Sequence, residues 1–269
     1  MLIGPDDDLM AVSMKQIVYF GCGLPSIAFA LCVALALLLH FEESTSTHCK
    51  VENFLPSISA AIGAYEPEMF IWRMLIALHC LPRFAMGFIY KNFYLSSPLR
   101  PFDATNSAVF RSAAWLLTSI HILENLALLT LSMVASVENK AVHEFGFCLF
   151  IVSSCAYMLL TLWLFHFSGR RRASTSGEKS FQYKLLLLSV SVVAIFSSLY
   201  FYWRHNTFCE PGVYTMFAMS EYVVVAANIA FHGTALWDFS DKRLVLLSAG
   251  SSDWRPIAQQ ELPFDLKST

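Results

Sequence analysis

The stretch IVYFGCGLPSIAFALCVALALLL, residues 17–39, decides the fold class because it holds 23 consecutive residues without a charged side chain. An α-helix rises about 1.5 Å per residue, so a segment of this length crosses the roughly 30 Å hydrocarbon core of a bilayer. The triplet Ala34-Leu35-Ala36 has the composition of a signal-peptide cleavage site. The apolar region of a signal peptide is only about 7–15 residues long, however. We therefore interpret residues 17–39 as a transmembrane helix.

Five further apolar runs of similar length follow along the chain. They are Trp72–Leu95, Val109–Val134, His143–Phe167, Tyr183–Trp203 and Val213–Trp237. Lipid offers no hydrogen-bond partners to an open strand edge, so only helices and closed barrels can span a membrane. The runs lack the alternation of about ten residues that is typical of barrel strands. The sequence predicts an all-α integral membrane protein, a six-transmembrane helix bundle.

The composition of the whole chain agrees with this prediction. Hydrophobic residues make up 56% of the 269 residues and charged residues only 14%, against about 25% charged in an average soluble domain. The mean hydropathy is +0.54. These values exclude a disordered protein, a nucleic-acid-binding protein and an ordinary soluble enzyme.

Lysine and arginine predict the orientation of the bundle. If the N-terminus is cytosolic, 13 of the 18 basic residues fall in cytosolic segments, as the positive-inside rule favours. Both termini are then cytosolic, with residues 1–16 before the membrane domain 17–239 and an unstructured tail at 240–269. The lumenal loops are then residues 40–71, 135–142 and 204–212.

Seven cysteines divide according to this topology. Cys49 and Cys209 are the two that lie in predicted loops, and both loops face the oxidising, lumenal side. A Cys49–Cys209 disulfide would tie the first lumenal loop to the third, although two free thiols remain the alternative. The other five fall inside predicted spans, where a thiol behaves as a small apolar side chain.

Ionisable residues inside the predicted spans are the first candidates for a functional site, because each costs about 2.5–3.5 kcal/mol to insert. His79 and Arg83 lie four residues apart and so share a helix face. Glu124, on the antiparallel third span, lies at a similar depth to Arg83. We therefore expect an Arg83–Glu124 ion pair.

The sixth span carries a second group of polar residues. Glu221, Asn228 and His232 are spaced by seven and four residues, which places them on one stripe. Two interpretations stay open: the intramembrane polar residues hold the helices together, or they line a cavity that receives a lipid headgroup, where arginine would attract phosphate. The candidate headgroup-binding residues are Arg83, Glu124, His79, Glu221, Asn228, His232 and Arg204.

The lumenal loops supply candidates for catalysis. His205 and Glu210 have a His-x4-Glu spacing similar to the His-x4-Asp of glycerolipid acyltransferases, in which a carboxylate orients a general base. His143 is the third candidate catalytic residue. Chance easily explains the His-x4-Glu spacing, and a capped and hydrogen-bonded loop is the alternative to a catalytic role. A metal site built from His48, His143, His205 and Glu210 is a weaker alternative, because no two of these histidines have helical i, i+4 spacing. We predict no metal site and no motif-bound cofactor.

Six segments in order along the chain resemble a known family. They are Phe41–Gly63, Trp72–Phe84, Glu124–Leu131, His143–Phe150, Arg204–Tyr214 and Glu221–Phe239. The chain resembles the family that contains post-GPI-attachment-to-proteins factor 2, the damage-regulated autophagy modulators and the yeast Sfk proteins.

The resemblance implies a role in remodelling the lipid of GPI-anchored proteins in the Golgi membrane, with the endoplasmic reticulum as second choice. Its partners would be lyso-GPI-anchored proteins and membrane lipids, and the lyso-GPI would receive a saturated acyl chain. Two function classes stay open. The protein is an acyltransferase that uses acyl-CoA or a phospholipid as acyl donor, or it is a non-catalytic lipid-binding scaffold that presents lyso-GPI to a separate enzyme.

Overall fold

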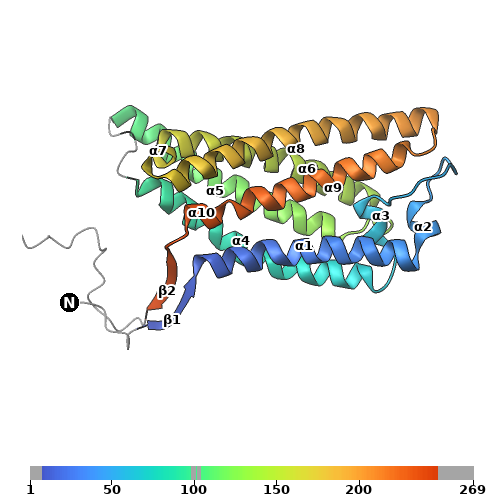
Figure 1. The fold of residues 1–269 in the computed structure, drawn as a ribbon, viewed down its shortest axis with the longest axis horizontal. Helices are drawn as coiled ribbons and strands as arrows, with labels where there is room; N and C mark the ends of the chain where they lie inside the picture. The colour runs from blue at the N-terminus through green and yellow to red at the C-terminus, as the bar shows by residue number, and fades with distance from the viewer. Residues whose placement is uncertain (1–7, 98–100, 102–103, 248–269) are drawn as a thin grey trace, which may run out of the picture.

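A computed structural model describes residues 8–97, 101 and 104–247. Within them, six helices are long and apolar enough to cross a membrane, and they run side by side along the long axis of the molecule (Figure 1). These helices are α1 (Met14–Leu39), α4 (Glu68–Leu95), α5 (Ala104–Met133), α6 (Lys140–Phe167), α8 (Thr175–Phe208) and α9 (Val213–Gly233). The predicted six-helix membrane bundle is confirmed.

The helices differ in their ends from the apolar runs that predicted them. The fifth run covered Tyr183–Trp203, whereas α8 has 34 residues and is about 51 Å long at the usual helical rise. It extends beyond the apolar run because Ser174 caps its N-terminus, where the hydroxyl accepts a hydrogen bond from the Gly177 amide at 3.0 Å. The sixth run is broken at Thr234, after which α10 (Ala235–Asp238) follows α9.

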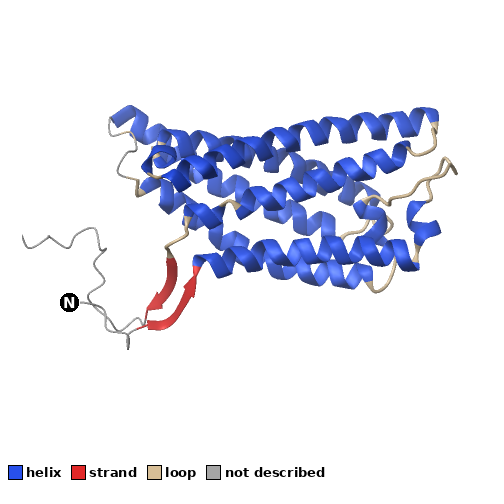
Figure 2. Ribbon diagram, in the orientation of Figure 1, coloured by secondary structure: helices blue, strands red, loops and turns tan. Residues whose placement is uncertain are grey.

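The two ends of the bundle carry different short elements (Figure 2). At one end, called here the disulfide end, α2 (Phe41–Thr45) and α3 (Ile58–Gly63) lie in the connection between α1 and α4. At the other, called here the strand end, the antiparallel strands β1 (Asp8–Ser13) and β2 (Arg243–Leu247) pair. A four-residue helix, α7 (Arg170–Ala173), also lies at the strand end.

Strand β2 corrects the expectation of an unstructured tail from residue 240 onward. Residues 243–247 find backbone partners in β1, with Ser13 opposite Arg243 and Val12 opposite Leu244. No local pattern predicts this pairing, because it joins segments more than 200 residues apart along the chain. Residues 248–269 of the expected tail lie outside the described residues.

Packing inside the bundle depends on small residues. Ala28, Cys32 and Ala36 repeat every four residues along α1 and are fully buried, and they belong to one apolar cluster with Trp72 and Ile76 of α4. Small side chains allow membrane helices to approach closely. Many large apolar side chains, such as Leu38, Phe145 and Phe196, are instead exposed on the outside of the bundle, as a lipid-facing surface requires.

Candidate functional site

A cavity of about 240 Å³ lies between the helices in the half of the bundle nearer the disulfide end. Its walls are mostly aliphatic and aromatic, and they come from α1, α3, α4, α5, α6, α8 and α9. Six lining residues carry polar side chains. They are Ser59, His79, Arg83, Ser198, Glu221 and Asn228. Such a cavity suits a chain of methylene groups that ends in a polar group.

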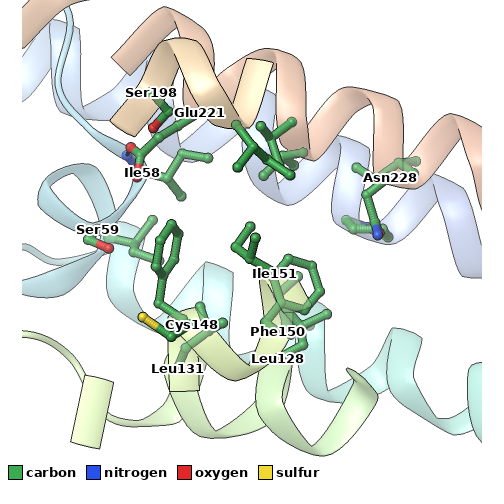
Figure 3. A pocket seen from close by; sticks show the side chains of 18 of the residues that line it. Ile58, Ser59, Leu128, Leu131, Cys148, Phe150, Ile151, Ser198, Glu221 and Asn228 are labelled. Atoms are coloured by element: carbon green, nitrogen blue, oxygen red, sulfur yellow. Dashed lines mark hydrogen bonds between the residues drawn. The ribbon is translucent and has the colours of Figure 1, made fainter. Parts of the chain in front are cut away.

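The polar lining residues divide between two regions of the cavity (Figure 3). Ser59, Ser198 and Glu221 lie at one end, near Ile58 of α3, and Asn228 lies at the other. Apolar side chains such as Ile151 separate the two regions. Both ends of the cavity can therefore make polar contacts, while the middle cannot.

Arg83 is the centre of the polar region in the middle of the bundle. Its Nη2 atom lies 3.1 Å from Oε2 of Glu124 and 2.6 Å from Nε2 of His232. Its Nη1 atom lies 3.4 Å from Nε2 of His79. The predicted Arg83–Glu124 pair and the shared face of His79 and Arg83 are both confirmed.

Backbone carbonyls fix the proton positions on two of the histidines in this region. A carbonyl oxygen only accepts hydrogen bonds, so Nδ1 of His79 donates to the Ile76 carbonyl at 2.8 Å, and Nε2 of His121 donates to the Arg83 carbonyl at 2.8 Å. In a neutral His79 the remaining nitrogen, Nε2, is an acceptor and suits the arginine that faces it. The histidine therefore adds no positive charge next to the guanidinium.

Asn228 joins this polar region to one further helix, α6. Its amide nitrogen donates to Oε1 of Glu124 at 3.0 Å and to the hydroxyl of Ser154 at 2.7 Å. The side chain of Glu124 is fully buried, so these contacts and Arg83 replace the water that the carboxylate would otherwise bind. The predicted stripe on the sixth span is confirmed, with Asn228 and His232 at the ion pair and Glu221 farther along the cavity.

Three ligand-type side chains in this region, His121, Glu124 and His232, have donor atoms within 4.8 Å of one another. Such a group could hold a metal ion by distance alone. The guanidinium of Arg83, however, already contacts both Glu124 and His232, and its positive charge takes the place that a cation would need. We therefore describe the region as an arginine–carboxylate centre.

A second polar arrangement, between Ser59 and His143, lies at the disulfide end. Nδ1 of His143 donates to the Val134 carbonyl at 2.8 Å, which leaves Nε2 of a neutral His143 as an acceptor. The hydroxyl of Ser59 lies 2.8 Å from that Nε2 atom. His143 is buried, whereas Ser59 is partly exposed and lines the cavity.

Hydrogen bonds from α9 hold the segment that carries Ser59. The carboxylate of Glu221 accepts a hydrogen bond from the Ile58 amide at 3.2 Å. The hydroxyl of Tyr222 donates to the Pro56 carbonyl at 2.6 Å, and that of Tyr214 donates to the Ser57 hydroxyl at 2.9 Å. The residues directly before Ser59 are therefore held against α9, which fixes the position of Ser59 at the start of α3.

The predicted pairing of His205 with Glu210 is wrong. Arg204 binds both carboxylate oxygens of Glu210, at 2.5 and 2.9 Å, and this contact holds the pKa of Glu210 below its usual value. Nε2 of His205 lies 3.0 Å from the Thr47 hydroxyl, and its Nδ1 has no partner. A bidentate arginine is a stronger partner for a carboxylate than a histidine, so the His-x4-Glu spacing did not predict the partner of Glu210.

The other predictions for the loops have mixed outcomes. The Cys49–Cys209 disulfide is present, with Cα atoms 5.3 Å apart, and the ring of His205 lies 5.7 Å from that of His48.

The alternative metal site is not assembled among the described residues, because Arg204 binds Glu210 and Ser59 contacts His143. Arg204 is partly exposed and bonded to Glu210, outside the cavity lining, so the candidate headgroup residues do not form one group.

Ser59 is not among the candidate site residues that the sequence predicted, although its partner, His143, is. Nothing in the run Pro56-Ser57-Ile58-Ser59 distinguishes one serine from the other. The difference arises from the fold, since Ser57 caps α3 by accepting a hydrogen bond from the Ala60 amide. Ser59 alone of the two faces the histidine.

Comparison with known proteins agrees with this architecture. The family model described as Frag1/DRAM/Sfk1/Cwh43P N-terminal domain matches residues 13–242, which contain all six long helices. The chain belongs to this family. The resemblance inferred from the six sequence segments is thereby confirmed.

Two named relatives are similar over nearly their whole length. Post-GPI attachment to proteins factor 2 of Caenorhabditis briggsae is 47% identical, over 95% of this chain and 97% of the relative. Acyltransferase PGAP2 of Xenopus tropicalis is 37% identical, over 92% and 97% respectively. Protein cwh43 of Schizosaccharomyces pombe is more distant, at 23% identity over 79% of this chain and 20% of its own length. No solved structure matches the chain.

Proposed function

We propose that this protein remodels GPI anchors by transferring a saturated acyl chain to lyso-GPI-anchored proteins. The names of its relatives, which refer to post-GPI attachment and to an acyltransferase, support this assignment. The observation that carries it is the apolar cavity inside the bundle, with polar groups at both ends. An acyl chain fits the apolar middle, and its carbonyl group reaches a polar end.

The proposed orientation places the disulfide end in the lumen of the Golgi and both termini in the cytosol. Disulfides form in oxidising compartments, and α7 brings three consecutive arginines to the opposite end, as the positive-inside rule favours for a cytosolic face. Antibody access to a C-terminal tag, before and after the inner membranes are permeabilised, tests this orientation. A tag that is reached only after the Golgi membrane is opened would contradict it.

The function is tested with purified protein in liposomes that contain lyso-GPI and a labelled saturated acyl donor. Wild-type protein should convert lyso-GPI to the diacylated form. Val225 lines the cavity, so Val225→Trp should fill the cavity and abolish transfer. Val193→Trp is the matched control, because Val193 lies on α8 with 67% of its surface exposed and outside the cavity lining.

A second candidate function is non-catalytic presentation of lyso-GPI to a separate enzyme. It is favoured by the charge balance of the central region, where Glu124 already neutralises Arg83 and helix association alone would explain the pair. Folded protein that binds lyso-GPI in the liposomes, and loses this binding with Val225→Trp, yet transfers no acyl chain, would favour the scaffold. It would overturn the acyltransferase assignment.

A further inference from the structure

We propose that Ser59 is the nucleophile that carries the acyl group during transfer and that His143 is its general base. This inference deepens the proposed acyl transfer and rests on it. It assigns a covalent step to two residues that the fold brings together from α3 and the first turn of α6.

The geometry of the two side chains fits this role. A serine is activated when its hydroxyl donates to a base, and when a third group holds that base in the correct tautomer. Here the Val134 carbonyl receives the proton on Nδ1 of His143 at 2.8 Å. The lone pair on Nε2 therefore faces the Ser59 hydroxyl, also at 2.8 Å.

A histidine partner distinguishes Ser59 from the other serine of the cavity lining. Among the described lining residues, Ser59 and Ser198 carry hydroxyls, and Ser59 is the one bonded to a histidine. Ser59 lines the cavity and is partly exposed, while His143, which is not among the lining residues, is only 6% exposed. The walls of the cavity beyond this polar end are mostly apolar and limit the entry of water, so an ester on Ser59 would persist until an acceptor alcohol arrives.

The surrounding contacts keep the nucleophile in place. Glu221 fixes the first residue of α3 through the Ile58 amide. Asn139 caps α6 by accepting a hydrogen bond from the Val142 amide at 3.1 Å, which positions the neighbouring His143. A catalytic pair needs this kind of support, because small displacements cause large losses of rate.

The proposed step balances without a metal or an oxidant. The oxygen of Ser59 attacks the carbonyl carbon of an acyl ester or thioester, and its proton moves to Nε2 of His143. The bond from that carbon to the donor breaks, and the departing lysophospholipid alkoxide or CoA thiolate takes the proton. The free hydroxyl of lyso-GPI then attacks acyl-Ser59, His143 accepts its proton, and the proton returns to the Ser59 oxygen as the ester bond breaks.

The half-reaction with donor alone tests the inference directly. Full-length protein in liposomes is incubated with phosphatidylcholine that carries a labelled saturated chain or, in a second arm, with labelled saturated acyl-CoA. The two arms identify the source of the acyl group. We expect one acyl group on the peptide that contains Ser59, detected by mass spectrometry, and none in Ser59→Ala. The matched control is Ser189→Ala, since Ser189 is exposed on α8 and its hydroxyl donates to the Leu185 carbonyl.

The base is tested with His143→Ala, which should slow acylation of Ser59 about 10²–10⁴-fold, the usual contribution of a general base. The control is His166→Ala, because His166 is exposed and outside the cavity lining. If Ser59→Ala does not fold, Ser59→Cys preserves the size of the side chain. Its acyl group would be a thioester, released by neutral hydroxylamine, whereas the serine ester would resist.

The outcomes separate this inference from the proposed function. Ser59→Ala protein that still acylates lyso-GPI at the wild-type rate overturns the nucleophile and leaves the function standing. Acyl-Ser59 that never passes its chain to lyso-GPI supports the nucleophile and overturns the acceptor. Protein that forms no acyl-enzyme and transfers nothing overturns both.

Discussion

The central ion pair allows a sharp prediction for Arg83→Met. The substitution removes a guanidinium that lies 3.1 Å from Glu124 and leaves a fully buried carboxylate without its countercharge. Methionine keeps an unbranched apolar side chain of similar reach, so the cavity that it creates is small. The loss of the charge partner should therefore dominate the change in stability.

The expected magnitude follows from this burial. Removing one partner of a buried ion pair costs about 3–5 kcal/mol. Because a domain of 150–250 residues shifts its Tm by about 2–4 °C per kcal/mol, Arg83→Met should lower the Tm by roughly 6–20 °C. The asparagine contact to Glu124, at 3.0 Å, compensates only part of the carboxylate's charge.

The assay is thermal unfolding of the purified protein in detergent micelles. The double variant Arg83→Met/Glu124→Leu should recover most of the lost stability, because replacing a whole buried pair with apolar side chains is often neutral. Lys140→Met is the control, since Lys140 and Glu144 form an exposed pair with 75% and 56% of their side-chain surface accessible, and such pairs contribute about 0–1 kcal/mol. An Arg83→Met protein as stable as wild type, or a double variant less stable than either single one, would refute the reasoning.

Three further predictions concern the disulfide, a helix contact and acid sensitivity. Cys49→Ser or Cys209→Ser removes the disulfide that joins segments 160 residues apart and should lower the free energy of unfolding by about 2–4 kcal/mol. The variant should have a lower Tm than wild type, and adding a reductant should not change that Tm further. Gly146→Ala would place a Cβ atom 3.1 Å from the α5 backbone and should cost about 1–3 kcal/mol, whereas Gly23→Ala, with open space around it, should not lower the Tm. The hydrogen bond from Arg73, and then that from the Ala135 amide, lower the pKa of Glu138 below its usual 4.5. The contacts of the Glu138 carboxylate therefore stabilise the protein fully above pH 4.5, and this stabilisation is lost as the pH falls through the lowered pKa. Wild type should therefore exceed Glu138→Gln in Tm at pH 7, and the difference should vanish on acidification; a difference independent of pH would contradict this.

Sequence predicted the parts of the site that depend on position along a helix. His79 and Arg83 share a face because residues four apart always do, and Glu124 meets Arg83 because antiparallel spans of known length fix relative depth. The disulfide followed from the same topology. The choice of partner among several polar neighbours did not follow, and Glu210 bonds to Arg204 where His205 was expected.

The sequence by itself determined that this chain is a bundle of six membrane helices, because the length and apolarity of a span are local properties that a bilayer imposes on each segment. It also determined the family, through six separate segments. Only the tertiary structure decided which side chains meet between elements. Ser59 lies 84 residues from His143 along the chain, and their hydrogen bond depends on how a short helix at the disulfide end docks against α6 and α9. Such docking is set by packing between distant segments, which no local pattern of residues encodes.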